Sequence, residues 1–146
     1  MKTEIEKDHA REQAKAQLES IIEMVDELEL AGDDEARRED AETAIQQDPL
    51  SVLVRSGWHE PGQLAEAEEF EIFLCTGGPA VRIMGGPAVR IMGELDEHKQ
   101  PSRAYIQYQD WGTPWTDFFA YKEVDPIPGM AMRKLLTYCQ KFYFGE

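Results

Sequence analysis

The segment Phe70-Glu-Ile-Phe-Leu-Cys-Thr76 opens the part of the chain that is richest in β-forming residues, and this part continues to Tyr121. Every second residue in the opening segment is a large apolar one: Phe70, Ile72 and Leu74. Alternation of this kind is typical of a strand that buries one face. The segment therefore predicts a strand at the centre of a sheet.

Three other segments also predict strands, and they are Leu50 to Ser56, Arg103 to Gln109 and Trp115 to Lys122. The segment from Arg103 to Gln109 alternates cleanly, with Ala104, Ile106 and Tyr108 on one side. Its other side is polar or aromatic, so we expect that side to face solvent or to serve a function. Together with the turn residues between them, these segments predict an antiparallel meander of about four to five strands.

The octapeptide Gly-Gly-Pro-Ala-Val-Arg-Ile-Met occurs twice in succession, at residues 77–84 and 85–92. Two identical copies are too few and too short for a solenoid. We interpret the second copy as an inserted duplication, natural or engineered. One copy is expected to fill a strand while the other loops out, because extra loop length costs little. A strand swap between two chains is the alternative.

The N-terminal third predicts a helical hairpin. Apolar residues spaced three and four apart form one stripe of a helix from about Lys2 to Leu30: Ala14, Leu18, Ile21, Val25 and Leu28. Gly32 is a stop signal. Asp33 or Asp34 is suited to cap a second helix, which Asp48-Pro49 ends near Gln47.

The C-terminal segment predicts one more helix, with apolar residues at helical spacing: Met132, Leu135, Leu136, Cys139 and Phe142. The fold class expected is therefore α+β in a single domain, residues 1–146. Within it, residues 1–48 form the acidic hairpin, 49–125 the antiparallel sheet with the duplicated octapeptide, and 126–146 the final helix.

The chain carries a formal net charge of −14, and residues 1–48 hold 16 of its 29 acidic side chains but six of its 15 Lys and Arg. Direct binding of nucleic acid is disfavoured, because such affinity comes largely from cations that neutralise phosphates. An acidic surface instead suits a host protein with a basic surface, including one that normally binds nucleic acid. Simple solubility is the other explanation.

Neither a membrane-spanning apolar run nor the apolar core of a signal peptide is found. Cys75 and Cys139 do not form a disulfide framework and are expected to be buried free thiols. These features predict a location in the cytoplasm and no contact with membranes.

No catalytic residue, metal site or cofactor is predicted. The three histidines, His9, His59 and His98, lack neighbours at metal-binding spacing. Of these, His59 alone resembles part of a site, because it lies between Trp58 and Glu60.

Two tryptophans surround a tight turn in Asp110-Trp-Gly-Thr-Pro-Trp115, and Trp58 lies in a similar turn. A tryptophan on a turn either closes the end of a core or anchors a partner. The residues that we select as candidate binding residues are Arg55, Trp58, His59, Asp110, Trp111, Thr113 and Trp115.

Four motifs resemble a family of small uncharacterised proteins carried by bacteriophages and other mobile elements. They are Ser51-Val-Leu-Val-Arg-Ser-Gly-Trp58, Phe73-Leu-Cys-Thr-Gly-Gly-Pro-Ala-Val-Arg-Ile83, Gln109-Asp-Trp-Gly-Thr-Pro-Trp-Thr116 and Phe142-Tyr-Phe-Gly145. The resemblance covers about Asp48 to Glu146, and the family carries a single copy of the octapeptide segment. It implies a bacterial host cytoplasm and an accessory role, but no specific activity.

Two classes of function follow. The first is a non-catalytic protein that binds a host protein through its acidic helices or its tryptophan turns. The second is a small enzyme or ligand-binding domain with a pocket lined by Arg55, Trp58, Trp111 and Trp115.

The interpretation of the repeat makes a testable prediction for hydrogen exchange. If one copy fills the strand and the other loops out, only one of the Val81 and Val89 amides is strongly protected in the monomer. Strong protection of both amides in a monomer would contradict the prediction.

Overall fold

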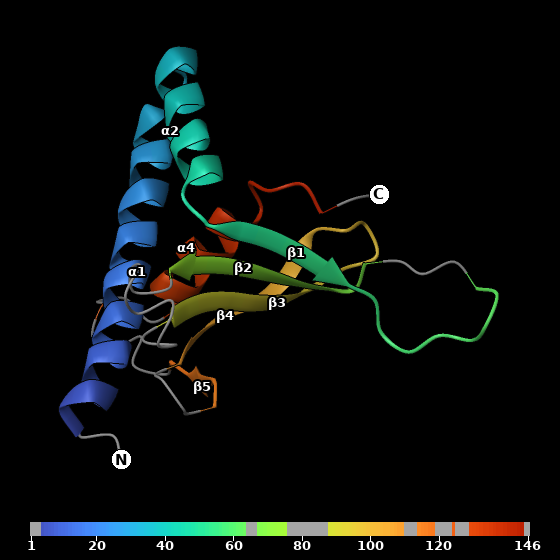
Figure 1. Cartoon of the computed structure of the whole chain (residues 1–146). Helices are drawn as coiled ribbons and strands as arrows, with labels where there is room; N and C mark the ends of the chain where they lie inside the picture. The colour runs from blue at the N-terminus through green and yellow to red at the C-terminus, as the bar shows by residue number, and fades with distance from the viewer. Residues whose placement is uncertain are drawn as a thin grey trace.

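The structure is a computed structural model that describes residues 4–63, 67–75, 88–109, 114–118, 124 and 129–144. Its elements in chain order are helices α1 (Glu4–Ala31) and α2 (Glu35–Gln47), strands β1 (Ser51–Arg55), β2 (Glu69–Cys75), β3 (Ala88–Leu95), β4 (Pro101–Gln109) and β5 (Thr116–Asp117), and helix α4 (Met130–Cys139). Figure 1 shows the helices gathered beside one sheet. The predicted α+β class, with a helix at each end of an antiparallel meander, is confirmed.

The five strands lie in the order β1-β2-β3-β4-β5, and each pairs antiparallel with the next. Directly paired residues share a face of the sheet. One such row crosses four strands through Val54, Phe70, Gly93 and Ala104. We call the face that carries this row the inner face, because its residues in β2, β3 and β4 are buried: Phe70, Ile72, Leu74, Val89, Ile91, Ala104 and Ile106.

Helix α1 supplies the layer that covers the inner face, and it contacts β3, β4 and α4. Its predicted apolar stripe is buried along its length, and Ala14, Leu18, Ile21 and Val25 have no exposed surface. Helix α2 packs on α1 through the buried residues Ala41 and Ile45. The hairpin tip rises beyond the sheet (Figure 1).

The caps of the hairpin are those that the sequence indicates. The Asp34 side chain accepts a hydrogen bond of 3.2 Å from the Arg37 backbone N–H and so caps α2. Gly32 has a φ of 52°, a left-handed conformation that glycine adopts without steric cost.

Helix α4 closes the core with Leu135, Tyr138 and Cys139, none of which has exposed surface. The Tyr138 hydroxyl donates a hydrogen bond of 2.7 Å to Asp48, so α4 is tied to the segment between α2 and β1. Burial and this hydrogen bond raise the pKa of Tyr138. Burial also raises the pKa of Cys139, which is the buried free thiol that was predicted.

Helix α4 is also held to α1 by Lys134, whose ammonium group binds the carboxylates of Asp26 and Glu29. Lys134 is 7% exposed and is the one charged residue in the buried part of the described chain. The hydrogen bonds that Lys134 donates to the two carboxylates raise the pKa of Lys134, and the one to Glu29 lowers the pKa of Glu29. The pairing therefore keeps Lys134 and Glu29 charged in the folded protein.

The second copy of the octapeptide supplies β3, since Ala88 to Met92 are its last five residues. The Val89 side chain is fully buried. The first copy, residues 77–84, lies outside the described residues, as do the Gly77-Gly78 turn and Val81. The hydrogen-exchange prediction is therefore sharpened: Val89 is the amide expected to be protected.

Two predicted strands differ in detail from the structure. In the segment from Leu50 to Ser56 the apolar residues Leu50, Val52 and Val54 occupy every second position, yet Leu50 and Val54 are 61% and 46% exposed. The reason is that β1 is the edge strand, where the helices cover little of the inner face. The strand predicted from Trp115 to Lys122 appears as β5, Thr116–Asp117, and residues 119–123 lie outside the described part.

Gly93 makes a close approach of two strands possible. A Cβ at this position would lie 2.3 Å from the Arg103 carbonyl oxygen and 2.3 Å from the Phe70 ring. Since the oxygen belongs to the backbone of β4, the strands would have to separate. We predict that Gly93→Ala lowers the free energy of unfolding by about 1–3 kcal/mol, as overpacking of a core does.

A urea unfolding titration measures this loss. Glu94→Ala, at the next and exposed position of the same strand, is the matched control and should change stability by no more than about 0.5 kcal/mol. Equal effects of the two substitutions would show that the Gly93 contact does not limit the fold.

Candidate functional site

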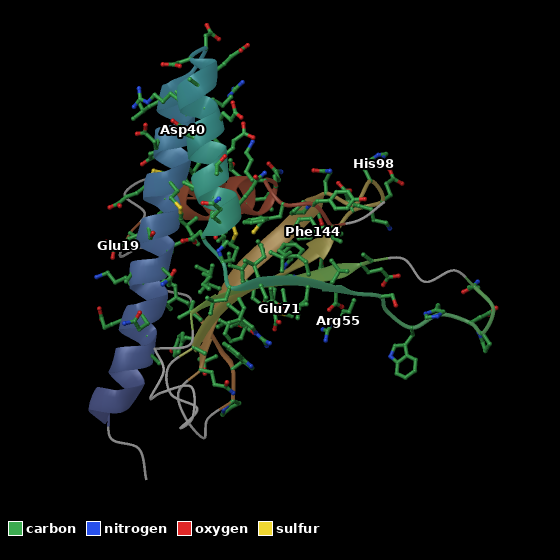
Figure 2. All side chains as sticks on the ribbon, turned by 45° about the horizontal axis from the view of Figure 1, so that its top comes forward. Glu19, Asp40, Arg55, Glu71, His98 and Phe144 are labelled. Atoms are coloured by element: carbon green, nitrogen blue, oxygen red, sulfur yellow. The ribbon has the colours of Figure 1, made fainter. Side chains whose placement is uncertain are left out.

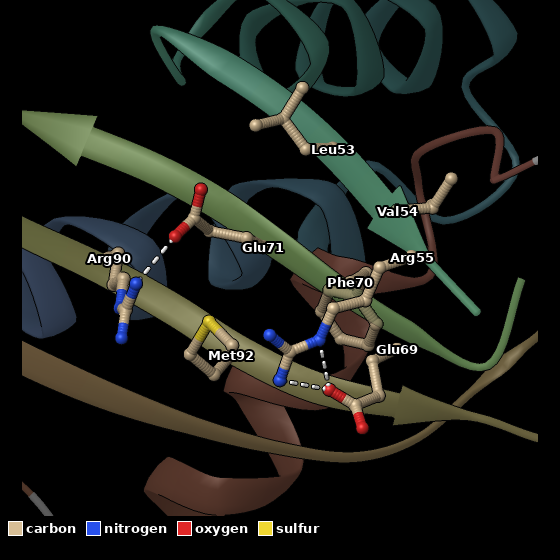
Figure 3. A pocket seen from close by; sticks show the side chains of 8 residues that line it. All are labelled: Leu53, Val54, Arg55, Glu69, Phe70, Glu71, Arg90 and Met92. Atoms are coloured by element: carbon tan, nitrogen blue, oxygen red, sulfur yellow. Dashed lines mark hydrogen bonds and ion pairs between the residues drawn. The ribbon is translucent and has the colours of Figure 1, made fainter. Parts of the chain in front are cut away.

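The second face of the sheet, which we call the outer face, carries polar, charged and aromatic side chains. No described helix packs on it. Its members are Ser51, Leu53 and Arg55 of β1, Glu69, Glu71 and Phe73 of β2, Arg90, Met92 and Glu94 of β3, Arg103, Tyr105 and Gln107 of β4, and Asp117 of β5. In Figure 3 the helices lie behind the sheet, and the labelled charged side chains stand in front of it.

Arg90 is the centre of this face. Its Nη1 donates a hydrogen bond of 2.6 Å to Glu71, and its Nε donates one of 3.0 Å to Gln107. The Gln107 side-chain amide then donates a bond of 2.8 Å to Asp117. The resulting network joins β2, β3, β4 and β5 in one line across the sheet.

The Arg90 network is partly shielded from solvent, because the Arg90 and Glu71 side chains are 19% and 23% exposed. The Trp115 ring lies over the Arg90 guanidinium, 4.0 Å from it, and meets the edge of the Phe73 ring at a centroid distance of 6.0 Å. A planar guanidinium under an aromatic ring gains cation–π attraction in addition to its hydrogen bonds. Arg90 is therefore held in one orientation from three sides.

A hollow of about 260 Å³ lies next to the network (Figure 3). Arg55 and Glu69 stand at one end of it and form an ion pair of 2.5 Å, while Arg90 and Glu71 form the other pair. Leu53 and Met92 supply apolar surface between the two pairs. The hollow thus presents both charges and an apolar floor, which suits a small polar ligand or a side chain of a partner.

Trp58 and His59 lie in a different place. Trp58 is fully exposed, and it belongs to the segment after β1 that extends away from the body of the protein (Figure 1). Local contacts order the start of this segment: the Gly57 N–H donates to Glu68 at 3.1 Å, and the His59 ring is 3.2 Å from the Gly57 carbonyl oxygen. Trp58 does not close the end of the core, which was one of its two predicted roles.

The structure therefore separates the predicted binding residues. Arg55 and Trp115 are on the outer face, with Arg55 lining the hollow and Trp115 covering Arg90. Trp58 and His59 are on the extended segment and do not line the hollow. Asp110, Trp111 and Thr113 lie outside the described residues.

The network residues Glu71, Arg90, Gln107 and Asp117 were not selected from the sequence. The signal that was present is the two-residue period of β2 and β4, which assigns Glu71 and Gln107 to the side opposite the core. The period does not give the register of the strands. The register pairs Arg90 with Gln107 and Gln107 with Asp117, and it places Glu71 diagonally opposite Arg90.

Among the described residues, no group of three or more His, Cys, Asp or Glu side chains is arranged to hold a metal ion. Within the same part of the chain, every helix is too short or too polar to cross a membrane. The chain matches no protein-family model, no curated protein and no solved structure.

The two ion pairs of the outer face allow a matched test. We predict that Arg90→Met lowers the free energy of unfolding by about 1–3 kcal/mol, because it leaves the half-buried Glu71 and Gln107 without their partner. Arg55→Met removes a more exposed pair, and should cost about 0–1 kcal/mol. The double variant Arg90→Met, Glu71→Met should regain part of the loss, since it removes the unpaired carboxylate.

Denaturant unfolding of the four proteins, wild type included, measures these differences. Similar losses for Arg90→Met and Arg55→Met would mean that the Arg90 network is no more than a surface ion pair.

Proposed function

We propose that this chain is a non-catalytic binding protein that engages a basic surface on a host protein. The observation that carries the proposal is the exposed acidic hairpin. Every residue from Gly32 to Asp40 is exposed, and five of these nine are Asp or Glu. Glu19 and Asp40 mark this surface in Figure 2.

The charge of the hairpin is only partly compensated within the described residues. Its ion pairs there include those of Glu27 with Arg37, and of Asp26 and Glu29 with α4. Other exposed carboxylates, such as Glu23, Glu39 and Asp40, form no ion pair with the described cations. A surface with surplus charge speeds association with a partner of opposite charge.

The resemblance to bacteriophage and mobile-element proteins supplies the context of the proposal, an accessory role in the cytoplasm of a bacterial host. In its most specific form, the hairpin takes the place of a nucleic-acid backbone on a host nucleic-acid-binding or defence protein. Tyr138 and Cys139 have a pKa that burial raises, but both side chains lie in the core, where a substrate does not reach them. Their raised pKa is therefore consistent with a protein that binds and does not catalyse.

One observation favours the alternative, a domain that binds a small ligand. The hollow on the outer face has two arginine–glutamate pairs, and Trp115 covers one of the arginines. Binding there depends on Trp115 and Arg55 and is indifferent to the charge of the hairpin.

The test must keep the hairpin in place, since removing residues 1–48 would also remove the α1 stripe that fills the core. We therefore compare two triple variants. The first neutralises exposed carboxylates of the hairpin: Glu23→Gln, Glu39→Gln and Asp40→Asn. The second neutralises three exposed carboxylates elsewhere: Glu60→Gln, Glu94→Gln and Glu97→Gln.

In an affinity capture from bacterial lysate, we expect wild type and the second variant to retain the same basic protein and the first variant to lose it. Capture should weaken steeply with added salt and with added DNA, because both compete for the cationic surface. Equal capture by the two triple variants would refute the proposal, and loss of capture only on Trp115→Ala would favour the ligand-binding alternative.

A further inference from the structure

Four of the seven exposed large apolar side chains in the described part of the chain lie within nine consecutive residues. Leu50, Leu53, Val54 and Trp58 are 61%, 58%, 46% and 104% exposed. Three of them belong to β1 or adjoin it, and Trp58 follows its end. Apolar groups gathered in this way usually mark a surface that another molecule covers.

The same residues lie on an open edge of the sheet. β1 pairs with β2 on one side, and no described strand pairs with its other side. An unpaired edge offers free backbone N–H and C=O groups, and proteins normally block it with charges, proline or a covering segment. In β1 the only charged residue is Arg55, at its end.

We propose that β1 pairs antiparallel with β1 of a second copy of this chain, around a twofold axis at Leu53, to join two five-stranded sheets into one. The pairing uses a surface separate from the acidic hairpin, and it goes beyond the proposed function. It is an isologous contact, in which the same patch serves both partners.

The register follows from the length of the strand. Full overlap of two Ser51–Arg55 strands places Leu53 opposite Leu53 of the second copy, and Ser51 opposite Arg55. Trp58 comes three residues after Arg55, so it reaches the end at which the second copy presents Leu50. On the outer face this register places Leu53 beside Leu53 of the second copy, and on the inner face it places Val54 beside Val52.

The net charge of −14 does not prevent two copies from pairing at this edge. Residues 49–59 contain no Asp or Glu, so two acidic chains meet here with little repulsion.

The other edge strand of the described sheet, β5, is two residues long, so it offers fewer backbone groups for pairing with another strand. Pairing through β1 thus closes the one long edge without extending into a fibre. The contact is small, so we expect an equilibrium between monomer and dimer in the micromolar range or weaker.

Sedimentation over a range of concentrations tests the proposal on the intact chain. The average mass of wild type should rise from that of a monomer towards that of a dimer. Leu53→Lys places two like charges opposite each other and should raise the dissociation constant roughly tenfold or more. Leu30→Lys is the matched control, since Leu30 is 69% exposed on α1 and lies far from the edge.

A cysteine cross-link tests the register in a Cys75→Ser background, in which the remaining Cys139 is buried. Leu53→Cys should form an intermolecular disulfide under mild oxidation, because directly opposed residues have the Cα separation that a disulfide requires. Ser51→Cys alone should not, whereas Ser51→Cys combined with Arg55→Cys should.

A wild-type protein that stays monomeric at every concentration, with no cross-link at Leu53, would overturn the proposal and leave the edge to a strand of another protein. A dimer that Leu53→Lys leaves intact, or that Leu30→Lys weakens equally, would also overturn it.

Discussion

Burial of the apolar stripe of α1 is the constraint on which the rest of the structure depends. The sheet and α4 both pack against this one helix, and α2 is held to it through Ala41 and Ile45. Since the stripe has almost no exposed surface, α1 is an integral part of the core and not an appended charged arm. Lys134 adds a polar link between α1 and α4 at the edge of this apolar contact.

The inner face of the sheet is buried in the core, whereas the outer face carries a network of hydrogen bonds. Val89 and Ile91 point to the helices and are fully buried, whereas Arg90 between them points to the outer face. The same strand therefore contributes to the core and to the hydrogen-bonded row that crosses the outer face. This row is rigid because Arg90 is held by Glu71, Gln107 and Trp115 together.

Periodicity in the sequence was sufficient to predict the elements and the buried sides of α1, β2 and β4. It was not sufficient for β1, because alternation does not distinguish an edge strand from a central one, and Leu50 and Val54 proved exposed. The roles of the tryptophans also depend on tertiary structure: Trp58 and Trp115 both follow turn-forming residues, yet one is free in solvent and the other covers Arg90. Each hydrogen bond of the Arg90 network joins residues 10 to 19 positions apart, and only the strand register brings them together.

The place of the octapeptide copies has a consequence for how this chain tolerates added sequence. Because the second copy supplies the start of β3, the whole first copy falls in the sequence that connects Cys75 of β2 to Ala88 of β3. Without the first copy, four residues would join the two strands; with it, twelve do, at an entropic cost of about 1 kcal/mol. The length of the added segment, odd or even, leaves the pairing of β3 unchanged. A peptide inserted between Cys75 and Ala88 would therefore lengthen the connection and leave the sequences of both strands intact.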